Sequence, residues 1–449
     1  TIYKNTPVRA GMAGGSADAA AVLVGLNELY GARLSAAELC ALGAQVGADV
    51  PFSIVGGLLL VWQGVPQNFE GNVVVETLEG TFQVIAMGPI AALEIIKHLG
   101  TNGGGFLGAN SSTPLENPTM LSNLIELYSM MLLPGACVIT FGKMVHARRQ
   151  EAADGMQRAG GLRARGGLSA AIYGREGRSI FAAMGILFVI GLSVCFWAES
   201  QGNPALADIG LDQAMGSMEG KEVRFGIAQS AMFTTVTTSF TTGTVNNMHD
   251  TLTPLGGMIP LLHMMLNVVF GGKGVGLMNM ILYAILAVFI CGLMIGRTPE
   301  YLGKKVALCI IIHPLLILAF SALAVGTAAG REGITNPGFH GLSQVLYEYA
   351  SSAANNGSGF EGLADNTCFW NITAGLAMFF GRYLSIVIQL AIAGSLMKKN
   401  FVNESAGTLR TDTVSFSVIL VFVVYIFAAL TFFPALALGP VAEHLALWG

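Results

Sequence analysis

Three short turns inside an otherwise apolar sequence carry residues that could bind a dehydrated cation. They are GTNGGGF at residues 100–106, SFTTGTV at 239–245 and AANNGSGF at 353–360. Each turn follows a short helix-like stretch and precedes an uncharged hydrophobic segment. Small Gly, Thr, Ser and Asn residues let backbone carbonyls crowd together at membrane depth, where the carbonyls can replace the water around an ion, as in selectivity filters. The turns therefore predict a membrane protein that conducts potassium.

Two of these turns form an internal repeat, because the order Asn, Gly, Gly, Phe at residues 102–106 returns at residues 356–360. Internal repeats of this kind build the pores of many transporters. Short helix-like stretches at 89–99, 226–239 and 341–350 end at the three turns. The C-terminal end of a helix carries partial negative charge, so three such ends that converge would favour a cation.

The composition is that of a membrane protein. Charged residues make up 11% of the 449 residues and hydrophobic residues 53%, whereas soluble domains contain roughly a quarter charged residues. Six segments with at most one ionisable residue reach the length of about 20 residues that a spanning helix needs: 121–142, 179–197, 277–296, 306–330, 369–397 and 413–439. Glycine and proline interrupt a seventh segment, 255–272, which predicts a discontinuous element.

Charge also predicts the orientation and argues against one class of partner. The loops at 143–178, 297–305 and 398–410 are rich in Lys and Arg, which predicts that they face the cytoplasm. The net charge is only -4, and no basic run is interleaved with aromatic residues. This pattern argues against binding of nucleic acid.

Cysteine and histidine spacing predicts no transition-metal site. The six cysteines are isolated, without a Cys-x-x-Cys pair, and the seven histidines form no His-Glu-x-x-His pattern.

One arginine lies inside a predicted span. Arg382 belongs to the segment 369–397, where a charge is costly unless it faces protein or water. One interpretation is a gate or charge barrier below the filter. The other is a structural pair with a backbone carbonyl or with Glu126, which lies in the segment 121–142.

Residues 1–57 differ from the rest, because they are amphipathic and rich in alanine. A glycine-rich turn opens into a helix here, and such a turn could hold a phosphate through Gly11, Gly14, Gly15 and Ser16. Together with GADVP at 47–51, it resembles the GHMP kinase superfamily, and 4-diphosphocytidyl-2-C-methyl-D-erythritol kinase within it. The resemblance implies that Asp49 would be the catalytic base if the kinase were complete. The rest of such a kinase is not found, so we expect a vestigial nucleotide site in an inactive fragment, joined near residues 56–58.

From residue 58 to 449 the chain resembles the potassium-binding A subunits of Kdp-type potassium-transporting ATPases. The strings that carry this resemblance are QGVPQNF, GTNGGGFLGANSSTPLENPT, WAESQGNP, MEGKEVRFG, MHDTLTPLGGM, GLMIGRTPEYLGKK, NPGFHGLSQVLYEYASSAANNGSGFEGL and TFFPALALGPVAE. The resemblance implies an all-α polytopic membrane protein of channel-like helix–pore loop–helix repeats, with a small α/β N-terminal fragment. Three of four repeats are found, near 86–142, 225–296 and 338–397, with a loop insertion at 151–174.

The same resemblance implies the function and the site. The chain would bind and translocate K⁺ in an ATP-driven uptake complex, as a multi-pass protein of the bacterial plasma membrane. It would have no catalytic activity itself, because a partner P-type ATPase subunit, with accessory subunits, would use ATP and Mg²⁺. The implied filter residues are Thr101, Asn102, Gly103, Gly104, Thr241, Thr242, Gly243, Asn355, Asn356, Gly357 and Ser358. Two alternatives stay open: an ATP-dependent GHMP-type kinase of an isoprenoid precursor, and an inactive chimeric fragment.

Overall fold

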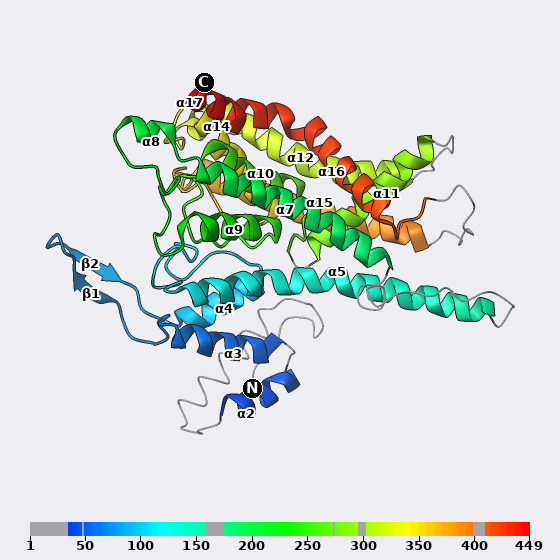
Figure 1. The fold of residues 1–449 in the computed structure, drawn as a ribbon, viewed down its shortest axis with the longest axis horizontal. Helices are drawn as coiled ribbons and strands as arrows, with labels where there is room; N and C mark the ends of the chain where they lie inside the picture. The colour runs from blue at the N-terminus through cyan, green and yellow to red at the C-terminus, as the bar shows by residue number, and fades with distance from the viewer. Residues whose placement is uncertain (1–34, 47–48, 158–174, 273, 295–301, 398–408) are drawn as a thin grey trace. The chain divides into compact units, whose positions relative to one another are not determined.

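The computed structural model describes residues 35–46, 49–157, 175–272, 274–294, 302–397 and 409–449, and these are mostly helical (Figure 1). The chain forms two compact units. The first consists of Thr1–Gly100 and Gly104–Ser129, and the second of Thr101–Gly103 and Met130–Gly449. The glycine-rich candidate residues 11–16 lie outside the described residues.

The first unit has a small helical core and one hairpin. Helix α3 (Asp49–Trp62) packs against α2 (Ala36–Val46) and α4 (Ile90–Leu99). Its buried centre consists of Leu60, Val65, Ile90, Ala91 and Ile95. Strands β1 (Val73–Glu76) and β2 (Phe82–Ile85) pair antiparallel, with Val73 opposite Ile85.

Helix α3 runs without interruption through the junction predicted near residues 56–58. Gly56 lies so close to Ile95 of α4 that a side chain at residue 56 would collide with it. Asp49 is the first residue of this helix. The domain boundary at 57/58 stays a prediction.

The second unit is a bundle of long and short helices. After α5 (Met120–Gln157), which begins in the first unit, follow α7 (Arg175–Ser200), α8 (Pro204–Asp208), α9 (Gly226–Ser239), α10 (Pro254–Leu266), α11 (Val275–Met294), α12 (Leu302–Gly326), α13 (Ala328–Arg331), α14 (Phe339–Ala354), α15 (Cys368–Met397), α16 (Val414–Leu436), the π-helical η1 (Ala437–Val441) and α17 (Ala442–Trp448). Helix α9 packs against α7 and α10, and α14 packs against α10, α12 and α15. The two short helices α9 and α14 are thus packed among other helices.

Five described helices are long and apolar enough to cross a membrane: Met120–Val145, Glu176–Asp208, Lys304–Gly326, Cys368–Met397 and Val414–Trp448. They confirm five of the six predicted spans. The sixth, 277–296, coincides with α11, whose searched apolar part, Val275–Cys291, is shorter. The chain is a polytopic helical membrane protein.

The three short helices predicted before the turns are confirmed as α4, α9 and α14. The predicted loop insertion at 151–174 stays a prediction, and α5 continues into it as far as Gln157. The sequence EAADGMQ at 151–157 is rich in good helix formers, so the helix extends past the membrane-length segment. Residues 158–174 lie outside the described residues.

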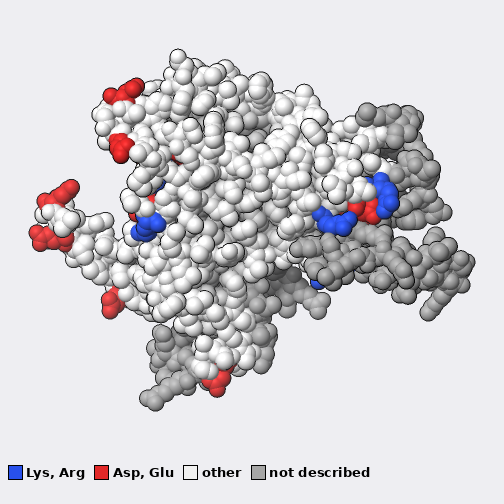
Figure 2. Space-filling model, in the orientation of Figure 1, with Lys and Arg blue, Asp and Glu red and all other residues white. Residues whose placement is uncertain are grey.

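Charged atoms of both signs lie at the two ends of the second unit in the view of Figure 2. The predicted orientation of the loops 143–178, 297–305 and 398–410 stays a prediction.

A buried ion pair ties three segments of the second unit together. Lys221 Nζ lies 2.7 Å from Glu199 Oε2, and both side chains are fully buried. The other Glu199 oxygen accepts hydrogen bonds from the backbone N–H and the hydroxyl of Thr253, at 2.9 and 2.7 Å. Thr253 also caps the N-terminus of α10. Glu199 therefore connects the end of α7 to the segment before α9 and to the start of α10.

We expect Lys221→Ala to destabilise the protein by about 3–5 kcal/mol, because it leaves the Glu199 carboxylate buried without its cation. The thermal unfolding midpoint of the detergent-purified protein measures this loss. The matched control is Arg410→Ala, whose partner is Asp412 at 3.2 Å. Arg410 is exposed, so its removal should cost about 1 kcal/mol or less. Equal losses for the two variants would contradict the role of the buried pair.

Candidate ion-binding site

The three turns share one backbone conformation. The first residue of each is left-handed, with φ of 47° at Thr101, 53° at Thr241 and 54° at Asn355. The glycine two positions later also has positive φ, with 69° at Gly103, 85° at Gly243 and 98° at Gly357. A positive φ is costly for most residues and free for glycine. The sequence repeat is therefore also a repeat of backbone geometry.

The second and third turns reverse the chain at the end of a short helix in the same way. The Thr242 N–H donates to the Thr237 carbonyl at 2.8 Å, and the Asn356 N–H donates to the Ser351 carbonyl at 3.0 Å. Both bonds span five residues, as in the Schellman ending, which requires a left-handed residue at the turn. The abrupt ends of α9 and α14 thus require the left-handed conformation of Thr241 and Asn355.

The three turns converge on one another within the second unit. A Cβ atom placed on Gly103 would lie 2.5 Å from the Thr242 carbonyl oxygen and 2.9 Å from that of Asn356. A Cβ atom on Gly357 would lie 3.7 Å from the Asn102 carbonyl oxygen. Only glycine fits at residue 103. Carbonyl groups from segments far apart in the sequence therefore gather in one place.

Buried side chains brace the third turn. Asn356 donates from Nδ2 to the Thr237 carbonyl in α9 at 3.2 Å, and its Oδ1 accepts from the Ser358 N–H at 3.0 Å. The Ser358 hydroxyl lies 2.9 Å from the hydroxyl of Tyr347. The Tyr347 hydroxyl lies 2.6 Å from Nδ1 of His249. This buried chain links the third turn to α9, to α14 and to the loop after the second turn.

The predicted discontinuous element 255–272 is a 13-residue helix, α10, followed by a loop. The helix ends at the left-handed Asn267, with φ of 47°. The Gly271 N–H then donates to the Ser239 carbonyl at 2.8 Å and the Gly272 N–H to the Phe240 carbonyl at 2.7 Å. The Thr241 hydroxyl donates to Oδ1 of Asn267 at 3.1 Å. The loop after α10 is therefore attached directly to the end of α9 and to the second turn.

Residues of all three predicted filter turns come together, and two further predicted residues are described separately. Gly104 has φ of 75° and belongs to the first unit. Arg382 has an exposed side chain and follows Gly381, whose Cα approaches the backbone of Ala353 at the end of α14. The Asn355 side chain also donates to the Met378 carbonyl in α15 at 3.2 Å. Arg382 thus lies about one helical turn from the helix segment that contacts the third turn.

Sequence reasoning did not find the chain of Tyr347, Ser358 and His249. Only Ser358 lay in a recognisable turn. Tyr347 and His249 sit 98 positions apart, and no local spacing connects them. Their contact results from the packing of α14 against the loop before α10.

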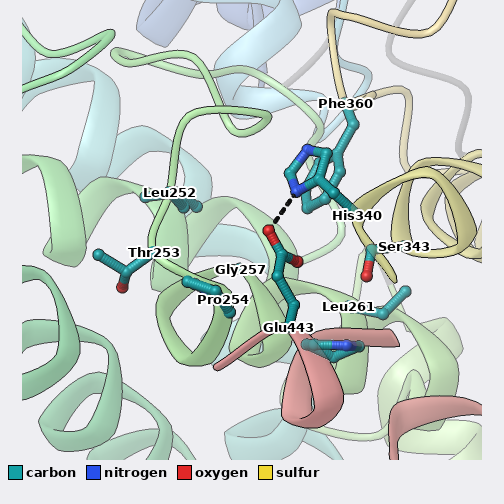
Figure 3. A pocket seen from close by; sticks show the side chains of 10 residues that line it. Leu252, Thr253, Pro254, Gly257, Leu261, His340, Ser343, Phe360 and Glu443 are labelled. Atoms are coloured by element: carbon teal, nitrogen blue, oxygen red, sulfur yellow. Dashed lines mark hydrogen bonds and ion pairs between the residues drawn. The ribbon is translucent and has the colours of Figure 1, made fainter. Parts of the chain in front are cut away.

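A histidine clasp holds the start of α14. His340 Nδ1 lies 2.8 Å from Glu443 Oε1, and its Nε2 lies 3.0 Å from Asp250 Oδ1. Carboxylates only accept, so both nitrogens donate and the ring is an imidazolium. Figure 3 shows this contact between His340 and Glu443 beside a small pocket that Leu261 and Phe360 also line. The clasp joins α14 to α17 and to the loop before α10.

Helices of membrane length, together with short helices whose terminal turns converge, define a polytopic membrane protein built from channel-like repeats. Residues 13–445 match the family KdpA, the potassium-transporting ATPase A subunit. The chain belongs to this family.

Curated relatives agree with this family. The chain is 53% identical over 412 residues to the potassium-transporting ATPase potassium-binding subunit of Geobacillus kaustophilus, which covers 90% of this chain and 69% of the relative. It is 54% identical over 406 residues to the subunit of the same name from Clostridium acetobutylicum, covering 89% of this chain and 68% of that protein. The matching subunit of Staphylococcus haemolyticus is 52% identical over 406 residues.

The family match also bears on the kinase-like N-terminal residues. It begins at residue 13 and so includes Gly14, Gly15, Ser16 and Asp49. The alternative function of a GHMP-type kinase therefore receives no support from these relatives.

The His340 clasp predicts a loss of stability at alkaline pH. Burial alone would lower the pKa of His340, but hydrogen bonds to Asp250 and Glu443 outweigh it and raise the pKa to about 9. The folded pKa is above the usual value of about 6.5, so the stabilisation is complete below pH 6.5 or so and is lost as pH rises through about 9. Thermal unfolding midpoints between about pH 6 and pH 10 measure this.

His340→Gln should lower the midpoint at the acidic end of that range and remove the difference from wild type at the alkaline end. The control is His313→Gln, since the His313 ring contacts the Met264 carbonyl at 3.1 Å and lies outside the clasp. The unfolding midpoint of His313→Gln should depend on pH in the same way as that of the wild type. The same pH dependence in His340→Gln would show that the clasp does not cause the loss of stability at alkaline pH.

Proposed function

We propose that this chain binds K⁺ at the converging turns and passes it across the bacterial plasma membrane as the ion-binding subunit of an ATP-driven uptake complex. The observation that carries the proposal is the convergence of the Thr242, Asn356 and Asn102 carbonyls around Gly103 and Gly357. Carbonyl oxygens held at fixed positions can replace the hydration shell of K⁺. The relatives named as potassium-binding subunits support the same ion.

The proposed filter consists of Thr101, Asn102 and Gly103 from the first turn, with Gly104 next to it, then Thr241, Thr242 and Gly243, and finally Asn355, Asn356, Gly357 and Ser358. The ends of α9 and α14 add partial negative charge beside the second and third turns. Both helices are enclosed by others, so this charge acts at low dielectric, where it is strongest.

The energy for uptake would come from a partner. The relatives' names describe a subunit of a potassium-transporting ATPase. We propose that a P-type ATPase subunit hydrolyses ATP with Mg²⁺, that accessory subunits complete the complex, and that this chain supplies ion selection. Arg382, about one helical turn from the contact with the third turn, would act as a charge barrier to unaccompanied ions.

We expect Gly103→Ala to lower the apparent K⁺ affinity of the reconstituted complex by about tenfold or more, because the added Cβ would displace carbonyls that coordinate the ion. Discrimination of K⁺ against Na⁺ should fall as well. The K⁺ and Na⁺ dependence of ATPase activity in the complex measures both effects.

Gly210→Ala is the matched control for Gly103→Ala. Gly210 also has a positive φ, 89°, but no atom lies within 4 Å of a Cβ placed there. This variant carries the same kind of backbone strain without touching a carbonyl of the turns. Its ion selectivity should equal that of the wild type. Unchanged ion selectivity in Gly103→Ala would contradict the proposal that the carbonyls around Gly103 form the filter.

Arg382→Gln tests the charge barrier. Removing the positive charge should raise passive K⁺ efflux from proteoliposomes in the absence of ATP, whereas Arg382→Lys keeps the charge and should retain the low efflux. If Arg382 has a structural role instead, the geometry of its guanidinium group matters. Arg382→Gln and Arg382→Lys would then lower the yield of folded protein equally.

A further inference from the structure

A buried cluster in the first unit gathers metal-ligating side chains away from the converging turns. Glu94 and His98 lie one helical turn apart on α4, and Glu126 comes from the start of α5. All three residues have no exposed surface. One ligand atom from each lies within 4.8 Å of the others.

The contacts of His98 fix which of its nitrogens carries a proton. Nδ1 lies 2.6 Å from the backbone carbonyl of Glu94, and a carbonyl can only accept, so Nδ1 donates. Nε2 donates as well if the ring is an imidazolium and accepts if the ring is neutral. It faces Oε2 of Glu126 at 3.3 Å. Two acceptors at this distance repel each other unless a proton or a metal cation lies between them.

Several ionisable groups meet at the cluster. They are the carboxylates of Glu94, Glu116 and Glu126, the ammonium of Lys97 and the ring of His98. Lys97 Nζ lies 2.8 Å from Oε2 of Glu94. Buried carboxylates are costly unless cations or hydrogen-bond donors stabilise them.

Hydrogen bonds from neighbours satisfy part of this negative charge. The Ser111 hydroxyl donates to Oε2 of Glu94 at 2.6 Å, and Glu116 accepts from the backbone N–H groups of Ser111 and Leu107 at 2.8 and 3.0 Å. The second oxygen of Glu94, Oε1, is buried and has no hydrogen-bond partner among the described residues. A buried carboxylate oxygen without a partner is a position where a cation would be stabilising.

We propose that Glu94, His98 and Glu126 bind one divalent transition-metal ion of the Zn²⁺ type. Zinc takes imidazole nitrogen and carboxylate oxygen as ligands at about 2.0–2.2 Å, so two tetrahedral ligands lie roughly 3.4 Å apart. The 3.3 Å between Nε2 of His98 and Oε2 of Glu126 matches this edge. The bond from Nδ1 to the Glu94 carbonyl orients the ring, as outer hydrogen bonds of metal-bound histidines do.

The Ser111 hydroxyl, 3.5 Å from Nε2 of His98, is within reach as a further ligand. Sequence patterns did not predict this site because only Glu94 and His98 are close in sequence. Their Glu-x-x-x-His spacing places both on one face of a helix. The third ligand comes from a separate helix.

The test is the metal content of the full chain purified in its complex from zinc-supplied cells. Plasma mass spectrometry should find about one zinc per chain, and His98→Gln should lower the content by about tenfold or more. Protein loaded with Co²⁺ in place of zinc should show the visible absorption of a low-coordinate cobalt centre, absent in His98→Gln. The control His444→Gln, a histidine of α17 outside the cluster, should keep full metal content.

The variant Glu126→Gln distinguishes a cluster that binds a metal ion from one that is neutralised by protons. If a metal is bound, this variant loses it and is less stable. If protons neutralise the cluster instead, the glutamine amide can donate to Nε2 in place of the proton, so stability is kept. Wild-type chain with no zinc above the background of His98→Gln, or Glu126→Gln as stable as the wild type, would overturn the proposal. Neither result would affect the proposed K⁺ site, whose residues other than Gly104 belong to the second unit.

Discussion

The placement of backbone carbonyls at three convergent turns is the constraint on which the rest of the second unit depends. Each turn requires a left-handed residue that is not glycine, at Thr101, Thr241 or Asn355. Strained positions of this kind cost about 1–3 kcal/mol each and persist only where the surroundings determine them. The surroundings do so here through the helix endings before the second and third turns, the loop after α10 and the side chain of Asn356. The strained residues of the turns and the contacts that hold them are therefore parts of the same structure.

Enclosing polar turns in an apolar bundle raises a second requirement, the satisfaction of buried polar groups. Helix α9 shows how this is met. Several of its hydroxyls donate to the carbonyl one turn earlier, such as Thr235 to Ala231 at 2.7 Å and Thr238 to Thr234 at 2.8 Å. Such internal bonds pair these buried hydroxyls without a partner from a neighbouring helix. The Lys221–Glu199 pair and the His340 clasp serve the same requirement where whole charges are buried.

Much of the architecture could be predicted from local sequence, because hydropathy and glycine-rich turns are local signals. Five spans, the three short helices and the residues of the turns followed from them. The continuation of α5 to Gln157 did not, since hydropathy marks only the apolar segment and not the helix-forming sequence 151–157 that follows it. The clasp of His340, the link from Tyr347 to His249 and the cluster around His98 also could not be predicted. Each depends on contacts between separate elements, and sequence spacing carries no information about those.

The repeats differ in their side chains while their backbones agree, and this difference has a physical meaning. The residue at the first position is threonine in two turns and asparagine in the third, yet all three have φ near 50°. The ion in the proposed site would contact the main chain, so side chains are free to attach each turn to a different neighbour. Thr241 bonds to Asn267, Asn355 to Met378 in α15, and Asn356 to Thr237. A site built from similar backbone units is thereby fixed in an asymmetric protein, and changes in these attachments would alter the position of one turn at a time.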